Sequence, residues 1–231
     1  MEMKQGIFYG VGIGPGDPEL ITRKAVRILE SCPVIAAPQT GGERTLALEI
    51  ARQAADLSGK TIVTLPFAMS RDREKQRAAH EAAVEAIVPH LREGRDVAML
   101  NLGDVSIYAT YGYLMGLIQE QGFETEMIPG VPSFCAAAAR LGISLTEMNQ
   151  PLHILPAGGC AVEEELALTG TKVLMKSGKR LPQVVDALKA DGRLEKSSAV
   201  LNCGLPGEQV YRDLAQLPED PGYFLTVIVK G

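Results

Sequence analysis

The chain has 231 residues, which is enough for one large α/β domain or two smaller ones that each bury a core. Its formal net charge of −5 argues against a general nucleic-acid binder, because such proteins need a basic surface. No apolar run reaches the roughly 20 residues that a membrane helix requires, and the start MEMKQG lacks the apolar stretch of a signal peptide. We therefore expect a cytoplasmic protein that binds neither nucleic acid nor membrane.

Short apolar runs alternate with longer helical patterns, and this alternation is typical of βαβ units. In the first half, the predicted strands are residues 7–13, 34–37, 61–67 and 97–102. The predicted helices of that half are residues 19–31, 43–57, 70–92 and 106–121. Asp17 and Ser70 stand where helix N-caps are expected, and Pro18 occupies the first position after Asp17.

The second half repeats this alternation with weaker periodicity. Its predicted strands are residues 125–128, 152–155, 171–176, 199–203 and 223–229. Its predicted helices are residues 132–141, 162–168, 181–191 and 208–217. The pattern therefore predicts an α/β fold, and a Pro-Gly turn near residues 124–130 marks the expected boundary between lobes 1–125 and 126–231.

The cysteines and histidines show no metal-binding pattern. No two of the four cysteines form a CxxC pair; they are Cys32, Cys135, Cys160 and Cys203. The three histidines are not spaced as metal ligands either. Because zinc and iron–sulfur sites need closely spaced ligands, we expect no resident metal.

The first candidate ligand loop is GVGIGPGDP, which spans residues 10–18 between a predicted strand and a predicted helix. Its glycines allow a sharp turn and a close approach of the backbone to a ligand. The dinucleotide fingerprint GxGxxG fails in every register, and the phosphate-binding GxxxxGK[ST] is missing from the chain. The loop is therefore either a ligand loop without a phosphate signature or simply a tight turn.

The second candidate is LGDVSIYATY, residues 102–111, after the most apolar of the predicted strands. Ligands gather at the carboxyl ends of parallel strands, and Gly103 would give them access to the backbone. Asp104 could accept hydrogen bonds from an ammonium group or from ribose hydroxyls. Tyr108 and Tyr111 are predicted to share one helix face. A helix cap followed by two packed tyrosines is the alternative.

The third candidate is PGVPSF, residues 129–134, a rigid turn that runs into the small-residue helix CAAAAR. Such a helix leaves room for a flat ligand, and the same pattern is typical of a tightly packed helix.

In this order and at these distances, GVGIGPGDPELIT, LGDVSIYATY and PGVPSF resemble the motifs of the tetrapyrrole methyltransferase family, and the likeness extends over essentially the whole chain. The second motif, with the pair Met175–Lys176, resembles most closely the C-20 methyltransferases of cobalamin biosynthesis, which act on precorrin-2 or cobalt-factor II. The resemblance implies two α/β lobes with a cofactor cleft between them. It also implies S-adenosylmethionine as methyl donor, S-adenosylhomocysteine as product and a homodimer.

The resemblance also implies which residues bind the cofactor and which act on the substrate. The implied cofactor-binding residues are Pro15, Leu102, Gly103, Asp104, Ser106, Ile107, Pro132, Ser133, Met175, Lys176, Cys203 and Thr226. Lys176 stands where many relatives have methionine, so either it or Met175 would meet the cofactor. The candidates for a catalytic base are Asp104, Tyr108, Asp17 and Tyr111, and methyl transfer to carbon can also proceed without a dedicated base.

A sirohydrochlorin-type substrate carries many carboxylates, which basic side chains would bind despite the acidic chain. The basic residues in suitable loops or helix starts are Arg44, Arg71, Arg73, Lys176, Lys179 and Arg180. Each of them could equally be solvated surface charge. Two other functions stay open at this point: another tetrapyrrole methylation, such as that of uroporphyrinogen, and a non-catalytic tetrapyrrole-binding module.

Overall fold

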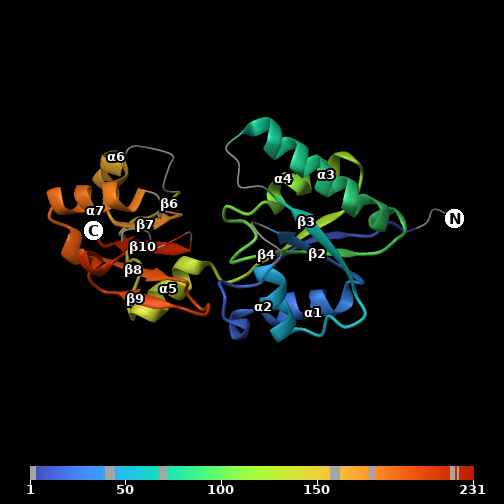
Figure 1. The fold of residues 1–231 in the computed structure, drawn as a ribbon, viewed down its shortest axis with the longest axis horizontal. Helices are drawn as coiled ribbons and strands as arrows, with labels where there is room; N and C mark the ends of the chain where they lie inside the picture. The colour runs from blue at the N-terminus through green and yellow to red at the C-terminus, as the bar shows by residue number, and fades with distance from the viewer. Residues whose placement is uncertain are drawn as a thin grey trace. The chain divides into compact units, whose positions relative to one another are not determined.

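The computed structural model describes residues 4–39, 45–67, 72–156, 162–176, 180–218, 222 and 224–231. The chain forms two compact units, Met1–Pro132 and Ser133–Gly231. Each unit is an α/β structure built on its own five-stranded sheet (Figure 1), as the sequence predicted.

The sheet of the first unit is entirely parallel, in the strand order β3-β2-β4-β1-β5. Its strands are β1 (Phe8–Gly12), β2 (Val34–Gln39), β3 (Thr61–Pro66), β4 (Val97–Asn101) and β5 (Thr125–Ile128). Its helices are the 3-10 turn η1 (Pro18–Leu20) and the α-helices α1 (Arg23–Ser31), α2 (Leu46–Ala54), α3 (Arg73–Arg92) and α4 (Tyr111–Glu120).

Helices cover both faces of this sheet, with α1 and α2 on one side and α3 and α4 on the other (Figure 1). Every residue of β1 and β4 is buried, which explains why both strands are almost purely apolar. The main core lies beneath α3 and α4, where Ile87 and Leu114 pack with Phe8 and Met99 of the central strands.

The sheet of the second unit is mixed, in the order β6-β7-β10-β8-β9. Strands β6 and β7 are parallel, and the other neighbours are antiparallel. Its strands are β6 (Leu152–Pro156), β7 (Thr171–Met175), β8 (Ser197–Leu201), β9 (Gln209–Tyr211) and β10 (Leu225–Val229). Its helices are α5 (Ser133–Leu141), α6 (Val162–Ala167), α7 (Leu181–Ala190), and the 3-10 turns η3 (Leu194–Lys196) and η4 (Leu214–Gln216).

The units divide later in the chain than residue 125, where the lobe boundary was expected. Strand β5 pairs in parallel with β1, from Phe8 opposite Thr125 to Val11 opposite Ile128. This pairing keeps the segment up to Pro132 with the first unit.

Helices α1 and α3 begin later than their sequence patterns indicated. Asp17 does cap a helical turn, since its Oδ1 accepts a hydrogen bond from Glu19 N at 2.9 Å, but that turn is only the 3-10 segment η1. Ile21 is extended, and α1 then begins with Thr22 as its N-cap. Helix α3 has Asp72 as its N-cap, whereas the expected cap Ser70 lies outside the described residues.

Two other predicted helices were wrong in part or in full. The helix expected from residue 106 begins only at Tyr111, because Tyr108 has a left-handed φ of 50° that cannot continue a right-handed helix. The helix expected at residues 208–217 is replaced by β9 and η4, since β9 pairs with β8. None of the helices in the described parts of the chain is both long and apolar enough to cross a bilayer.

Candidate functional site

The three candidate loops meet at one edge of the first sheet. They follow β1, β4 and β5, which are neighbours in the order β4-β1-β5. Because these strands are parallel, their carboxyl ends lie at the same edge, the usual ligand-binding edge of such sheets. Gly14 and Gly103 join the first two loops in an antiparallel bridge, where Gly103 N donates to Gly14 O at 2.7 Å and Gly14 N donates to Gly103 O at 3.2 Å.

Glycine is needed where these loops touch. A Cβ on Gly12 would lie 2.6 Å from the backbone nitrogen of Gly130, and a Cβ on Gly130 would lie 2.3 Å from the carbonyl oxygen of Gly103. All of these neighbours are backbone atoms, which cannot move aside as a flexible side chain could. The glycines of the three motifs therefore let the loops pack directly against one another.

Asp104 links the second loop to the third. Its Oδ1 accepts hydrogen bonds from Ser106 N at 2.8 Å and Ser106 Oγ at 2.5 Å, and its Oδ2 accepts one from Gly130 N at 2.9 Å. Burial acts to raise the pKa of this carboxyl, but the hydrogen bonds from Ser106 and Gly130 outweigh it, so the pKa is lowered. A carboxylate held in this way is a stable anion and a weak base.

The side chains of the loop between Asp104 and α4 differ in their exposure to solvent. Ser106 and Tyr108 are exposed, Tyr108 by 44%, and Ile107 is half-buried. The left-handed φ of 50° at Tyr108 is uncommon for a bulky residue and is often found at functional sites.

The structure removes Tyr111 from the candidate bases. Its side chain is fully buried, and its hydroxyl donates to the carbonyl oxygen of Phe8 at 2.8 Å. The ring packs against Gly10, where a Cβ would lie 2.5 Å from it. Burial raises the pKa of this phenol. Tyr108 and Tyr111 do not share a helix face as predicted, because Tyr108 precedes the helix.

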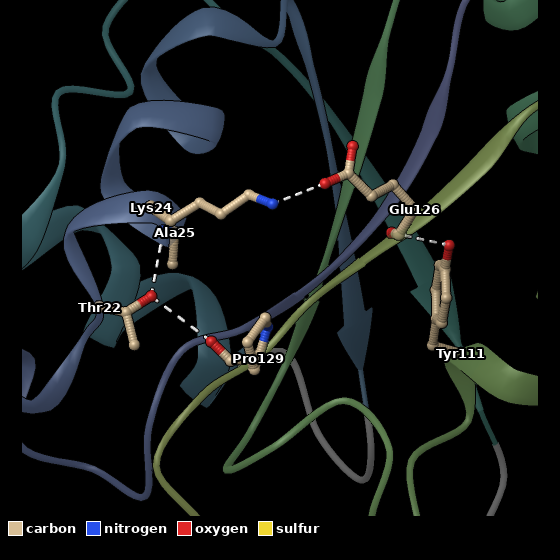
Figure 2. Close-up of polar contacts among 6 residues, drawn as sticks. All are labelled: Thr22, Lys24, Ala25, Tyr111, Glu126 and Pro129. Atoms are coloured by element: carbon tan, nitrogen blue, oxygen red, sulfur yellow. Dashed lines mark hydrogen bonds and ion pairs between the residues drawn. The ribbon is translucent and has the colours of Figure 1, made fainter.

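The first motif is tied to β5 through the start of α1, as Figure 2 shows. Thr22 Oγ1 accepts a hydrogen bond from Ala25 N at 3.2 Å and donates one to Pro129 O at 3.4 Å. Lys24 Nζ donates to Glu126 Oε1 at 2.7 Å. Within the motif itself Pro15 is buried, while Asp17 is half-buried and caps η1. The described contacts of Asp17 are therefore those of a helix cap.

In the second unit, the predicted residues Met175, Lys176, Cys203 and Thr226 come to one edge of the sheet. Thr226, near the start of β10, is opposite Met175, the last residue of β7. Thr226 is also opposite Val200 of β8, and Cys203 follows shortly after that strand ends. Cys203 and Thr226 are buried, Met175 is half-buried and Lys176 is exposed.

Two residues at this edge have left-handed backbones directly after a strand. Lys176 follows β7 with a φ of 60°, and Asn202 follows β8 with a φ of 51°. Asn202 was not among the predicted site residues. The turn residues of LNCGLPGE, which follow a buried strand, are the signal that could have identified it. The other predicted residues, Leu102, Pro132 and Ser133, are each half-buried. Leu102 and Pro132 belong to the first unit, and Ser133 is the first residue of α5 in the second.

The predicted basic residues are only partly described. Arg44, Arg71 and Lys179 lie outside the described residues. Arg73 is exposed at the start of α3, and the half-buried Arg180 donates from Nε to Gln183 Oε1 at 3.3 Å. Within the described ranges, no cluster of three or more His, Cys, Asp or Glu side chains is arranged to hold a metal ion.

Comparison with known proteins gives a family and several long relatives. Residues 8–218 match the family described as tetrapyrrole (corrin/porphyrin) methylases. The cobalt-precorrin-2 C(20)-methyltransferase of Salmonella typhimurium is 33% identical over 97% of this chain and 96% of its own length. A probable cobalt-precorrin-2 C(20)-methyltransferase of Methanocaldococcus jannaschii is 36% identical over 78% of this chain and 76% of its own length.

Solved structures agree on the fold. A cobalt precorrin-4 methyltransferase superposes with a TM-score of 0.72 at 20% identity, over 97% of this chain and 94% of that one. A uroporphyrin-III C-methyltransferase from Thermus thermophilus, complexed with S-adenosylhomocysteine, superposes with a TM-score of 0.70 at 24% identity, over 97% of both chains.

Proposed function

Since this chain belongs to the tetrapyrrole (corrin/porphyrin) methylase family, we propose that it transfers a methyl group from S-adenosylmethionine to C-20 of precorrin-2 or its cobalt form. The observation that carries the proposal is its near full-length likeness to C(20)-methyltransferases. The joined loops at the carboxyl edge of the first sheet support it. The reaction belongs to cobalamin biosynthesis, and its second product is S-adenosylhomocysteine.

The residues at the carboxyl edge of the first sheet fit this methyl donor. S-Adenosylmethionine carries a sulfonium and an ammonium group, and it has no phosphate. The Gly10–Pro18 loop matches neither phosphate-binding pattern, and the pKa of Asp104 is lowered, so that an anion lies in the second loop. Asp104 Oδ2 accepts one hydrogen bond, from Gly130, which leaves acceptor capacity for a ribose hydroxyl or an ammonium group.

When bound, S-adenosylmethionine supplies an electrophilic methyl group that a nucleophilic carbon of the tetrapyrrole attacks in line with the S–C bond. The contribution of the protein is mainly orientation, which can be worth roughly 7–11 kcal/mol. We assign this role to backbone and side-chain groups of the three joined loops, around Pro15, Gly103, Asp104, Ser106 and Ile107. Their mutual contacts keep these loops in place before the substrates bind.

The remaining candidates for a base are Tyr108 and Asp17. Asp104 is a weaker candidate, because three hydrogen bonds stabilise its charged form. Tyr108 is the best placed of these groups, since it is exposed on the loop that starts at the carboxyl edge. Replacement of Tyr108 by Phe should lower kcat if its hydroxyl moves the proton, whereas an unchanged kcat would indicate transfer without a dedicated base.

The test is incubation with precorrin-2, and separately with cobalt-loaded sirohydrochlorin, each together with a methyl-labelled donor. The expected label is at C-20 of one or both substrates. Label at another carbon would assign the chain to a different tetrapyrrole methylation. If calorimetry shows binding of the donor but no methyl transfer occurs, a non-catalytic binding module is favoured. If the donor does not bind even at high concentration, the chain is not a methyltransferase that uses it.

The cytoplasmic location and the homodimer stay predictions from the sequence and its resemblance. Light scattering after size-exclusion chromatography tests the dimer, since one chain has a mass of 24.7 kDa. We also retain Arg73, Lys176 and Arg180 as candidate partners of the substrate carboxylates, to be tested by single replacements that should raise the substrate KM.

A further inference from the structure

The turn that follows β8 has an unusual backbone and depends on outside support. Asn202, Gly204 and Gly207 all have left-handed φ values, of 51°, 75° and 80°. Asn202 N donates to Phe224 O at 3.0 Å, and Leu205 N donates to Asn202 O at 2.8 Å. A turn with three such residues loses much conformational freedom when it orders. Further contacts are therefore needed to hold it in one shape.

The carboxylate of Glu208 supplies those contacts from the end of the same turn. Its Oε2 accepts a hydrogen bond from Gly204 N at 2.8 Å. Its Oε1 accepts from Arg140 Nε at 2.6 Å and Nη2 at 2.5 Å. The Glu208 side chain is only 18% exposed, whereas that of Arg140 is 59% exposed. Both carboxylate oxygens are thus engaged, one inside the turn and one on helix α5.

A second contact repeats the connection between this region and α5. Arg212 Nη1 donates to the carbonyl oxygen of Leu141, the last residue of α5, at 2.8 Å. Arg140 and Arg212 therefore fasten the segment after β8 to the end of the helix that Ser133 begins. All of these groups belong to the second unit.

The carboxylate also touches one of the residues assigned to the cofactor. Burial acts to raise the pKa of Glu208, but hydrogen bonds from Gly204 N, Arg140 and the Cys203 thiol outweigh it, so the pKa is lowered. The ionised carboxylate therefore holds both Cys203 and the next residue of the turn. Cys203 lies at the same sheet edge as Thr226 and Met175.

We propose that Glu208, anchored by Arg140, is a positioning residue that holds the Asn202–Gly204 turn in the shape required to bind S-adenosylmethionine. The inference rests on the proposed function, because it assumes that this edge of the second sheet contacts the cofactor. Glu208 acts through the turn rather than on the reacting atoms. Its loss should therefore weaken cofactor binding and leave the chemical step nearly unchanged.

The experiment measures calorimetric affinity for S-adenosylhomocysteine and the kinetics with S-adenosylmethionine. Glu208→Ala should raise Kd and the cofactor KM roughly tenfold, because a turn held by charge-assisted hydrogen bonds must then be ordered upon binding. The kcat at saturating cofactor should stay within about twofold of the wild type. Glu208→Gln keeps an acceptor for Gly204 N but loses the charge that faces Arg140. Its Kd and cofactor KM should therefore lie between those of the wild type and Glu208→Ala.

Glu81→Ala is the matched control, because it removes another Arg–Glu ion pair, with Arg77 on the exposed surface of α3. Its cofactor affinity should equal that of the wild type. If Glu208→Ala is too unstable to purify, Glu208→Gln and Arg140→Gln take its place, each with an expected rise in Kd of roughly threefold or more. Wild-type affinity in the folded Glu208 variants would overturn the inference alone, whereas a wild-type protein without cofactor affinity would overturn the proposed function and the inference with it.

Discussion

Replacement of Asp104 by Ala tests whether the three loops of the first unit are held together by this carboxylate. The change removes the acceptor of three hydrogen bonds, two from Ser106 and one from Gly130. Ser106 is exposed, so water can replace the acceptor there. Gly130 is half-buried and joins the loop after β5 to the loop after β4, so its N–H loses a partner that water replaces less well.

We expect Asp104→Ala to lower the free energy of unfolding by about 2–3 kcal/mol. A hydrogen bond to a charged group is worth roughly 1.5–3 kcal/mol, and the loss at Gly130 counts almost fully while the loss at Ser106 counts only in part. Asp72→Ala is the control, because Asp72 is an exposed N-cap that accepts from Glu74 N and Lys75 N. Its loss should cost only about 1 kcal/mol.

Urea unfolding followed by circular dichroism measures both variants, and hydrogen exchange reports on the amide of Gly130. In Asp104→Ala that amide should exchange faster than in the wild type, and S-adenosylmethionine should bind more weakly. If Asp104→Ala costs no more than Asp72→Ala and the amide of Gly130 keeps its protection, the carboxylate does not hold these loops together.

The same carboxylate predicts a pH dependence. Its pKa is lower in the folded protein than in the unfolded chain, so its contribution to stability is fully present above the unfolded value of about 3.9. The contribution is lost as the pH falls through the folded pKa. The difference in stability between wild type and Asp104→Ala should therefore be constant from about pH 7 to pH 5 and should shrink below about pH 4.

Three further predictions concern packing and burial. Gly130→Ala should destabilise the protein by about 1–3 kcal/mol in urea unfolding, because its Cβ would meet backbone atoms; Gly116→Ala, whose Cβ faces open space on α4, should instead stabilise it by about 0.5–1 kcal/mol. Tyr111→Phe should cost about 0.5–1.5 kcal/mol, because it removes the buried hydroxyl that donates to Phe8 O, yet kcat should not change; a large drop in kcat would restore Tyr111 as a base. Lys172 is buried, and burial followed by the charge of Arg193 lowers its pKa. The free energy of unfolding of the wild type should therefore rise as the pH rises from the folded pKa of Lys172 towards the unfolded value of about 10.4. Lys172→Met should be more stable than the wild type at pH 7, and this difference in stability should shrink as the pH approaches about 10.4. A difference that does not change with pH would contradict the prediction.

The α/β class and most of the strands were predictable from the amino-acid sequence. Strands such as β1 and β4 are buried on both faces, so their apolar runs are visible without any knowledge of their neighbours. The three motifs and their spacing were likewise sufficient to identify the family, because the loops pack directly against one another at positions where only glycine fits.

Features that depend on distant partners became visible only in the folded structure. Residues 209–211 form a strand because β8 offers them an edge, although their local pattern indicated a helix. Tyr111 is a core residue because its hydroxyl reaches the carbonyl of Phe8, far away in the sequence. The links made by Asp104 to Gly130 and by Glu208 to Arg140 each join separate segments, so no local pattern could reveal that these two carboxylates hold loops in place.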